Sequence, residues 1–137
     1  MEELVSRQLI QNMLWVRNKM NYLQKREASK KISELFRANY PAGCIKLSNE
    51  TLSHFTVKCK LAHWFYKNGY QVYSEASLKG TNCRPDLFIK NDTSCYIVEV
   101  LQTETDKKFT EKIKKYPKDI PIIKVKVKEF DYDNFKF

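Results

Sequence analysis

The sequence predicts an α/β domain whose core elements follow the order α-β-β-β-α-β, preceded by an N-terminal helical region. Apolar residues recur at helical spacing in several segments, and two apolar runs flank a four-residue turn sequence. The chain also holds only 3 Gly and 4 Pro. So few turn-forming residues disfavour sandwiches and barrels built from many tight turns, and favour long helices with a few strands.

The composition is that of a globular protein with a basic surface. The 137 residues are 42% hydrophobic and 30% charged, which predicts a real core and argues against a disordered chain. The longest early apolar run, residues 13–16, is far shorter than the roughly 18 residues of a membrane helix. We therefore expect a soluble intracellular protein with no membrane partner, located in the cytoplasm or, for a viral source, in the host cytoplasm. The four cysteines form no C-x-x-C pair, which excludes a zinc ribbon and predicts burial as small apolar residues.

The N-terminal region carries a heptad seam on a helix expected over residues 2–28. Its apolar residues alternate at spacings of four and three: Leu9, Met13, Val16, Met20 and Leu23. Such a seam needs a partner, which is either the helical pattern at residues 32–36 or the same helix in a second subunit. A Tyr-Pro-Ala-Gly sequence at residues 40–43 ends this region. We therefore divide the chain into residues 1–43, for packing or homodimerisation, and the domain of residues 44–137.

A helix is expected to follow from Ser48 or Asn49, either of which is a good N-cap, to Gly69, a natural residue for a helix C-terminus. Its apolar face is Leu52, Phe55, Cys59, Ala62 and Tyr66. Residues 70–78 then alternate between apolar and polar types, which predicts a strand.

The remaining elements form a hairpin, a helix and a last strand. Residues 86–90 and 95–101 flank the turn sequence Asn-Asp-Thr-Ser, which predicts an antiparallel hairpin. Thr103 or Thr105 can cap a helix that Pro117 ends, before a strand over residues 120–127. This helix carries Phe109, Ile113 and Tyr116 on its apolar face.

The hairpin register places two acidic residues directly opposite each other. If residues 91–94 form the turn, Lys90 pairs with Cys95 and Asp86 lies opposite Glu99. Two facing carboxylates repel each other unless a cation lies between them, and a divalent metal ion is the obvious cation. Glu99 also interrupts an otherwise apolar strand, where a buried acid must be satisfied. The alternative is a pair of acids at an exposed sheet edge.

Other polar residues can complete such a site. Glu75, on the preceding strand, can supply a third carboxylate, and an oxygen-rich site suits Mg²⁺ or Mn²⁺ better than zinc. On the expected helix, Glu50, His54 and Lys58 share one face at spacings of four. They are either a plain polar face or a group in which Lys58 helps to hold a phosphate or a water nucleophile.

These residues resemble the PD-(D/E)xK nuclease superfamily over roughly residues 50–127. Pro85-Asp86 looks like its PD element, and Glu99 looks like its second acid. The string formed by His54 and Lys58, the Leu-Ala-His-Trp sequence, Glu75 and Arg84-Pro85-Asp86 is similar to that of competence-associated CoiA-like nucleases. The resemblance implies a restriction-endonuclease-like core with a mixed central sheet, and metal ligation by Asp86, Glu99 and Glu75.

The sequence departs from this family at Leu101, where the superfamily expects a lysine two residues after the second acid. Related branches carry glutamine near this position and a lysine displaced to the core helix. By resemblance, Lys58 is then the replacement and Gln102 an assisting polar group, with Arg84 as an alternative replacement.

The resemblance and the charge together predict a Mg²⁺- or Mn²⁺-dependent DNA endonuclease. With 25 Lys and Arg against 16 Asp and Glu, the net charge is +9, which favours binding to a phosphate backbone. We expect His54, Arg84, Lys107 and Lys108 to contact nucleic acid. No base-reading motif is visible, which favours selection of DNA structure over sequence, and a homodimer would resemble junction resolvases. The alternative is a non-catalytic basic DNA-binding or assembly module on the same fold.

Overall fold

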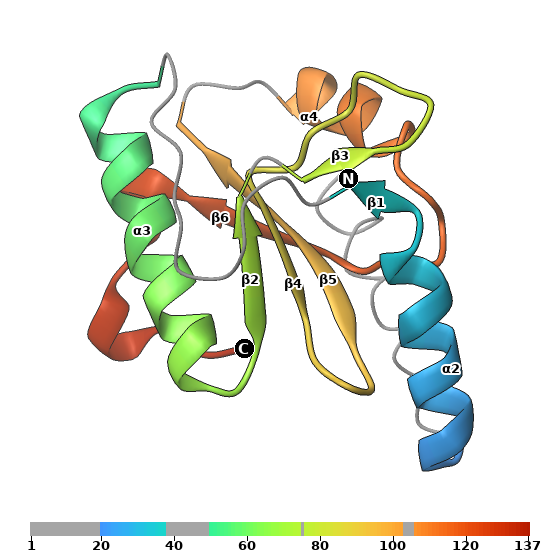
Figure 1. Ribbon diagram of the computed structural model, residues 1–137. Coiled ribbons are helices and arrows are strands. Elements are labelled where there is room, and N and C mark those ends of the chain that lie inside the picture. Colours follow the sequence, from blue (N-terminus) through green and yellow to red (C-terminus); the bar gives the residue numbers. More distant parts are fainter. Residues whose placement is uncertain (1–19, 38–49, 75, 103–105) are drawn as a thin grey trace.

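The computed structural model describes residues 20–37, 50–74, 76–102 and 106–137, and the statements below concern these residues. Its core elements follow the order α3, β2, β4, β5, α4 and β6 (Figure 1), which confirms the predicted α/β class and element order. The helices are α2 (Tyr22–Ser33), α3 (Leu52–Lys67) and α4 (Asp106–Ile113), and two 3-10 turns, Val127–Glu129 and Tyr132–Asn134, follow the last strand. The strands are β1 (Phe36–Arg37), β2 (Gln71–Ser74), β3 (Ser77–Leu78), β4 (Leu87–Lys90), β5 (Cys95–Leu101) and β6 (Ile122–Lys126).

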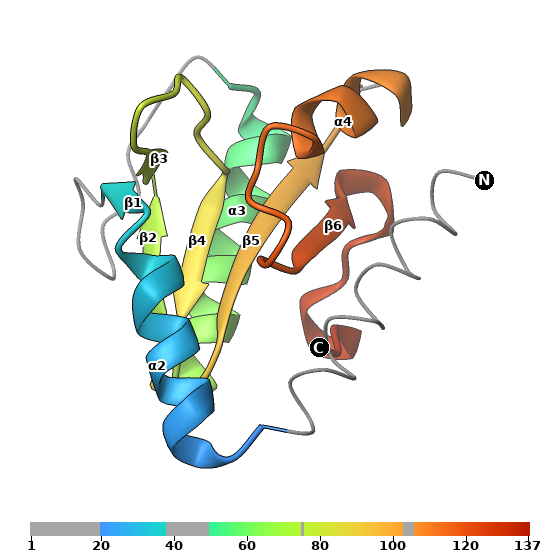
Figure 2. The same cartoon turned by 90° about the vertical axis from the view of Figure 1, so that its right-hand side faces the viewer.

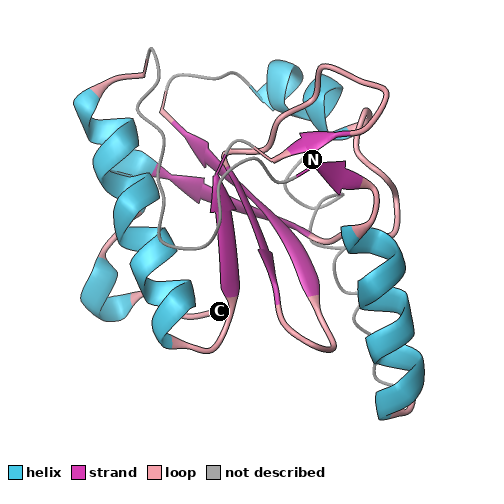
Figure 3. Ribbon diagram, in the orientation of Figure 1, coloured by secondary structure: helices cyan, strands magenta, loops and turns pink. Residues whose placement is uncertain are grey.

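The central sheet is mixed and has the strand order β2-β4-β5-β6. Neighbouring strands β2, β4 and β5 pair antiparallel, whereas β6 pairs parallel to β5. A parallel pair needs a crossover connection, and the segment that contains α4 provides it (Figure 3). All seven residues of β5 are buried, because both faces of this strand are covered.

Each face of the sheet packs against its own cluster of buried side chains. On one face, α3 contributes Val57, Leu61 and Phe65, which pack against Leu87, Ile89 and Val98 of the hairpin. The other face carries Phe88, Cys95 and Ile97, which pack with Phe36, Tyr116 and Ile120. Helices α3 and α2 accordingly lie on opposite sides of the sheet (Figure 2). Within the described ranges, no helix is long and apolar enough to span a membrane.

Helix α3 begins slightly later than the sequence predicts. Thr51 is its N-cap, with a side chain that accepts a hydrogen bond from the His54 amide, whereas Ser48 and Asn49 lie outside the described residues. A cap at residue 48 or 49 is therefore wrong. The predicted end is confirmed, because Asn68 is the C-cap and Gly69 adopts a φ of +88°, which favours glycine.

The expected strand over residues 70–78 is two short strands with different partners. The first, β2, pairs with β4 in the central sheet, whereas β3 pairs antiparallel with β1. Ala76 is fully buried just before β3, where the chain leaves the central sheet. The alternating pattern continues through this change of partner, so periodicity alone did not reveal it.

The predicted hairpin register is confirmed. Lys90 pairs with Cys95, and the pairing continues to Leu87 opposite Val98. At the turn, the Asn91 amide donates to the Ser94 carbonyl at 2.8 Å, and the Asn91 side chain accepts from the Thr93 amide at 3.0 Å. One step beyond Leu87, this register brings Asp86 beside Glu99.

A single helix over residues 2–28 is wrong, because a separate helix begins at Tyr22. Asn21 has extended backbone angles and forms a reciprocal capping box with Gln24, with bonds of 3.0 and 2.8 Å. Met20 thus precedes the cap, and Leu23 is 70% exposed, so these two residues do not continue one seam. The seam residues Leu9, Met13 and Val16 lie outside the described residues.

The segment from α2 to β1 packs into the core of the domain. The Ser29 hydroxyl is buried, donates to the Asn91 carbonyl at 3.1 Å and lies 3.1 Å from the Cys95 sulfur. Phe36 stacks on Phe88 with ring centroids 4.5 Å apart. The described part of the predicted N-terminal region is therefore integral to the domain core. The proposed boundary at residue 43 lies outside the described residues.

Two truncations test this packing. Deletion of residues 1–20 should leave a cooperatively folding protein, whereas deletion of residues 1–40 should abolish the thermal transition measured by circular dichroism. The larger deletion removes Ser29 and Phe36 and exposes the apolar surface beneath them. Sedimentation of the shorter deletion also tests homodimerisation, since it removes most of the seam. A truncation of residues 1–40 that melts like the full chain would contradict the assignment of α2 and β1 to the core.

Candidate active site

The polar residues singled out in the sequence meet at one end of the central sheet. Asp86 immediately precedes β4 and Glu99 lies near the end of β5, so the antiparallel pairing brings both to the same end. The N-terminus of α3, with its cap Thr51, lies at this end as well (Figure 1). Helix α4 follows directly after β5 and completes this region.

Glu99 is a fully buried acid with both carboxylate oxygens hydrogen-bonded. The Tyr116 hydroxyl donates to Oε1 at 2.6 Å, and the Lys112 ammonium donates to Oε2 at 2.8 Å. Its exposed fraction is 0%, so the alternative of two acids at an exposed sheet edge is wrong for this residue. Burial, reinforced by the negative charge of Asp86, raises the pKa of Glu99 to about 7, although Lys112 and Tyr116 oppose the rise.

Asp86 is held in its ionised form beside Glu99. Its Oδ2 accepts from the Val100 amide at 2.7 Å and lies 3.5 Å from His54 Nε2. Burial alone would raise the pKa of Asp86, but the hydrogen bonds with His54 and the Val100 amide lower it below its usual range. The two neighbouring carboxylates thus differ in acidity, and Asp86 is the stronger acid.

His54 links α3 to the ends of both hairpin strands. Its Nε2 lies 2.9 Å from the Val100 carbonyl oxygen, and its Nδ1 bonds to Glu50. The hydrogen bond to Asp86 raises the pKa of His54 to about 9 against the opposing effect of burial, and Glu50 adds to the rise. At neutral pH the ring is therefore an imidazolium, which donates from both nitrogens.

Lys58 lies behind this histidine. Its Nζ is 3.5 Å from Glu50 Oε1, and the side chain is only 2% exposed. The shared face predicted for Glu50, His54 and Lys58 is thereby observed, although Glu50 precedes the first helical residue. Together they form a line of alternating charges that ends at Asp86, with Lys58 buried and the other three side chains partly buried.

The other predicted site residues lie at the margins of this cluster. Gln102 accepts a hydrogen bond from the Thr51 hydroxyl and so ties the end of β5 to the start of α3. Arg84 is exposed two residues before Asp86, and Lys107 and Lys108 are exposed on α4. Glu75, the predicted third ligand, lies outside the described residues.

Sequence reasoning missed the partners of Glu99. Lys112 and Tyr116 come from the segment after β5, and Tyr116 was predicted only as part of an apolar face. Lys112 precedes Tyr116 by four, a spacing that places two residues on the same side of a helix, although α4 ends at Ile113 and Tyr116 follows it. That spacing would place a cation and a hydroxyl together, but it does not identify Glu99 as their target.

Oxygen atoms of the kind that a hard divalent cation prefers lie at this end of the sheet. Asp86 lies close enough to Glu99 to raise its pKa, and Asp86 Oδ2 and the Val100 carbonyl oxygen both approach the same nitrogen of His54. Carboxylate and carbonyl oxygens are the ligands that Mg²⁺ and Mn²⁺ prefer. Among the described side chains, no three histidine, cysteine, aspartate or glutamate residues cluster as a metal site. A protein-bound ion would therefore rely on Asp86, Glu99 and a further ligand.

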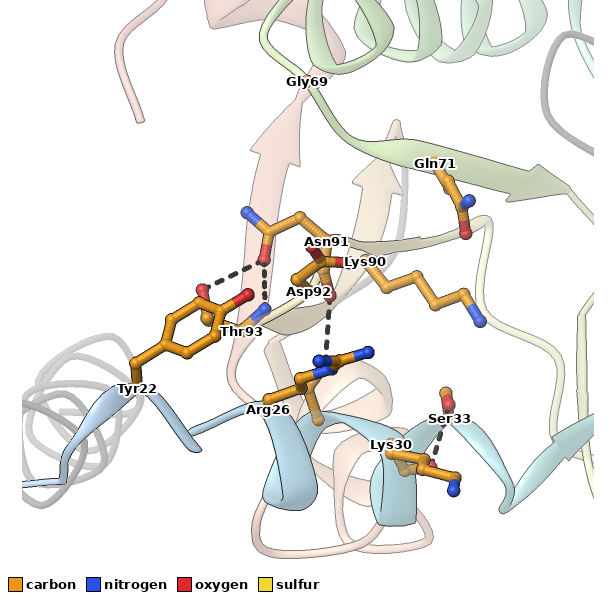
Figure 4. A pocket seen from close by; sticks show the side chains of 11 residues that line it. Tyr22, Arg26, Lys30, Ser33, Gly69, Gln71, Lys90, Asn91, Asp92 and Thr93 are labelled. Atoms are coloured by element: carbon orange, nitrogen blue, oxygen red, sulfur yellow. Dashed lines mark hydrogen bonds between the residues drawn. The ribbon is translucent and has the colours of Figure 1, made fainter. Parts of the chain in front are cut away.

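A separate cavity lies at the opposite end of the hairpin. It has a volume of about 600 Å³ and separates α2 from the turn, with Arg26, Lys30, Lys90 and Asn91 among its lining residues (Figure 4). Neither Asp86 nor Glu99 lines it. The carboxylates are thus distant from this cavity along β4 and β5.

The α/β fold, the mixed sheet and the paired carboxylates at its end are consistent with a nuclease-like domain, and a family comparison identifies this class. The family model of the competence protein CoiA nuclease-like domain matches residues 50–122, which is more than half of the chain. The protein therefore belongs to this family, and the resemblance to CoiA-like nucleases is confirmed. The match contains every site residue discussed above. Searches of curated proteins and of solved structures gave no match.

Proposed function

We propose that this protein is a metal-dependent DNA endonuclease of the PD-(D/E)xK type, with a restriction-endonuclease-like core. The observation that carries the proposal is the apposition of Asp86 and buried Glu99 on paired strands, flanked by the cations of His54 and Lys112. Membership of a nuclease-like family supports the same reaction class. The arrangement suits a reaction in which a divalent ion and a polyanionic substrate meet.

In this proposal, Asp86 and Glu99, with Glu75 as a third ligand, hold Mg²⁺ or Mn²⁺. When bound, the ion supplies an activated water and neutralises charge on the phosphate. Hydrolysis forms one O–P bond from the water and breaks one bridging P–O bond, and a proton passes to the leaving oxygen. The hydrogen bonds with His54 and the Val100 amide lower the pKa of Asp86 and orient it for this task.

Residues of α3 support the carboxylates. Lys58, the displaced lysine implied by the family resemblance, pairs with Glu50 and through it holds His54 against Asp86. Gln102 fixes the end of β5 to Thr51. These contacts preserve the positions of the reacting groups. Even small displacements of such groups lower the reaction rate strongly.

DNA is the proposed substrate because the chain carries a net charge of +9. Arg84, Lys107 and Lys108, which are exposed, are proposed to contact the phosphate backbone around the site. His54, expected from the sequence to do the same, has both ring nitrogens bonded within the protein, to Glu50 and to the Val100 carbonyl. The selectivity is proposed to be for DNA structure, and a homodimer through the N-terminal seam would present two such sites.

The decisive experiment incubates the purified protein with supercoiled plasmid and with linear, single-stranded, flap and four-way-junction DNA, with Mg²⁺, Mn²⁺ or EDTA. We expect nicking or cleavage with either metal and none with EDTA. The Asp86→Asn variant, purified in parallel, controls for a contaminating nuclease. Failure to cleave every substrate under all metal conditions would overturn the proposal.

One observation favours the alternative, a non-catalytic DNA-binding or assembly module. Leu101 stands where the superfamily lysine is expected, and both oxygens of Glu99 already accept hydrogen bonds from Lys112 and Tyr116. Such a module would bind DNA with a strong salt dependence and leave every substrate intact.

The exposed lysines at the start of α4 provide a prediction for DNA binding. The double variant Lys107→Ala/Lys108→Ala should weaken binding and reduce the magnitude of the log K against log salt slope by about 2, because each lost phosphate contact contributes about 0.9. Fluorescence anisotropy over a salt series measures this slope. Lys60→Ala/Lys67→Ala, on exposed positions of α3, is the matched control. Equal slopes for the two double variants would place the DNA elsewhere.

A further inference from the structure

Lys112 connects helix α4 to the paired carboxylates. Its Nζ lies 2.8 Å from Glu99 Oε2, and 32% of its side chain is exposed, whereas Glu99 is fully buried. The lysine therefore runs from the surface to the acid. We propose that Lys112 is the catalytic cation that contacts the scissile phosphate. This inference rests on the proposed nuclease function.

The charge of Lys112 acts on both carboxylates. It lies in direct contact with Glu99, and it also lowers the pKa of Asp86 by its positive charge. A phosphate bound by these two acids through a divalent ion would consequently meet the same ammonium group. The lysine that the superfamily carries two residues after the second acid would also place a positive charge beside both carboxylates. In this chain that position is the buried, aliphatic Leu101.

Accessibility distinguishes Lys112 from Lys58. The Lys58 side chain is 2% exposed and its Nζ lies 3.5 Å from Glu50, so it is enclosed by protein. A phosphate on a DNA backbone reaches only groups that are open to solvent. Lys58 therefore acts through its ion pair with Glu50 inside the protein, whereas the ammonium group of Lys112 is accessible to the substrate.

Tyr116 makes the position of Lys112 well defined. Its hydroxyl holds Oε1 of Glu99 while Lys112 holds Oε2, so the carboxylate is fixed from both sides by one segment. Since an ammonium has three N–H donors, Lys112 can bond to Glu99 and donate to a phosphate oxygen in the same complex. Tyr116 is thus a positioning residue for Glu99.

The chemical role of Lys112 is electrostatic. As water attacks phosphorus, negative charge accumulates on the non-bridging oxygens, and a fixed cation stabilises that charge more than it stabilises the ground state. No proton or electron is transferred by Lys112. Removal of one such fixed donor typically lowers the rate by about 10²- to 10³-fold.

The test compares Lys112→Ala with Lys114→Ala, an exposed lysine of the adjoining turn, and with Lys58→Met. Cleavage rate, melting temperature, Mn²⁺ affinity by calorimetry and the salt slope of DNA binding are measured for each. We expect Lys112→Ala to lower the cleavage rate by about 10²-fold and the salt slope by about one, with Mn²⁺ still bound. Lys114→Ala should cleave like wild type. Lys58→Met loses the ion pair that holds His54 against Asp86, so it should lower both the melting temperature and the cleavage rate but leave the salt slope of DNA binding unchanged.

Each outcome decides a separate point. A wild-type protein that binds DNA without cleaving it overturns the proposed function and, with it, the catalytic role of Lys112. Wild-type cleavage by Lys112→Ala overturns the inference alone. Should Lys112→Ala fail to fold, Lys112→Gln keeps a donor for Glu99 without the charge, and Lys112→Arg keeps the charge. Activity in Lys112→Arg but not in Lys112→Gln supports the inference. Equal activity of the arginine and glutamine variants contradicts it.

Discussion

We expect Asp86→Asn to abolish Mn²⁺ binding in calorimetry and to lower DNA cleavage on the order of 10³-fold. Asp86 is the more acidic member of the carboxylate pair, because the His54 and Val100 hydrogen bonds outweigh the effect of burial on its pKa. An amide removes the negative charge that a divalent ion requires. It also relieves the repulsion felt by Glu99, which offsets part of the stabilisation lost with the His54–Asp86 ion pair.

The fold should survive this substitution, since the asparagine side-chain oxygen can still accept from the Val100 amide, the contact seen at 2.7 Å. Asp92→Asn is the matched control, because Asp92 is exposed at the turn of the same hairpin. It should bind Mn²⁺ and cleave like wild type. Undiminished Mn²⁺ binding by Asp86→Asn would remove Asp86 from the metal site.

The largest effect on stability is expected from Phe88→Ala, which should lower the free energy of unfolding by about 3–5 kcal/mol. Phe88 is 2% exposed, stacks on Phe36 at 4.5 Å and lies 6.3 Å from the Tyr73 ring. Its removal leaves a cavity between the central sheet and β1. Since domains are typically stable by only about 5–15 kcal/mol, this loss is a large fraction of the total.

Urea unfolding followed by circular dichroism measures the change, with Leu52→Ala as the control. Leu52 is 80% exposed on α3, and its replacement should change the free energy of unfolding by less than about 0.5 kcal/mol. Similar stabilities for Phe88→Ala and wild type would show that β1 does not pack on the sheet in solution.

Within the candidate site, the strongest prediction from sequence was the register of the hairpin. A four-residue turn sequence between two apolar runs fixes which residues pair, and a shift by one residue would expose the apolar side chains of β5. The pairing of Lys90 with Cys95 confirms this, and it brings Asp86 beside Glu99. Helical spacing likewise placed His54 and Lys58 on one side of α3.

The errors of sequence interpretation share a physical origin. Apolar periodicity continues through Asn21, yet the Asn21 side chain and Gln24 satisfy backbone groups that only a new helix start leaves unpaired. Alternation also continues from β2 to β3, although β3 leaves the central sheet to pair with β1. In both places the pattern reports which residues are apolar, whereas hydrogen bonding decides where an element begins and with which strand it pairs.

The sequence by itself determined the α/β class, the element order, the hairpin register and the acidic pair, because each follows from spacing between residues that are near in the chain. Only the tertiary structure decided that Lys58 is enclosed while Lys112 and Tyr116 hold Glu99. Those relations depend on how α4 turns back over the end of β5 before the parallel strand β6. The distances between side chains of α4 and β5 are set by packing between these elements. They cannot be predicted from the spacing of residues along the chain.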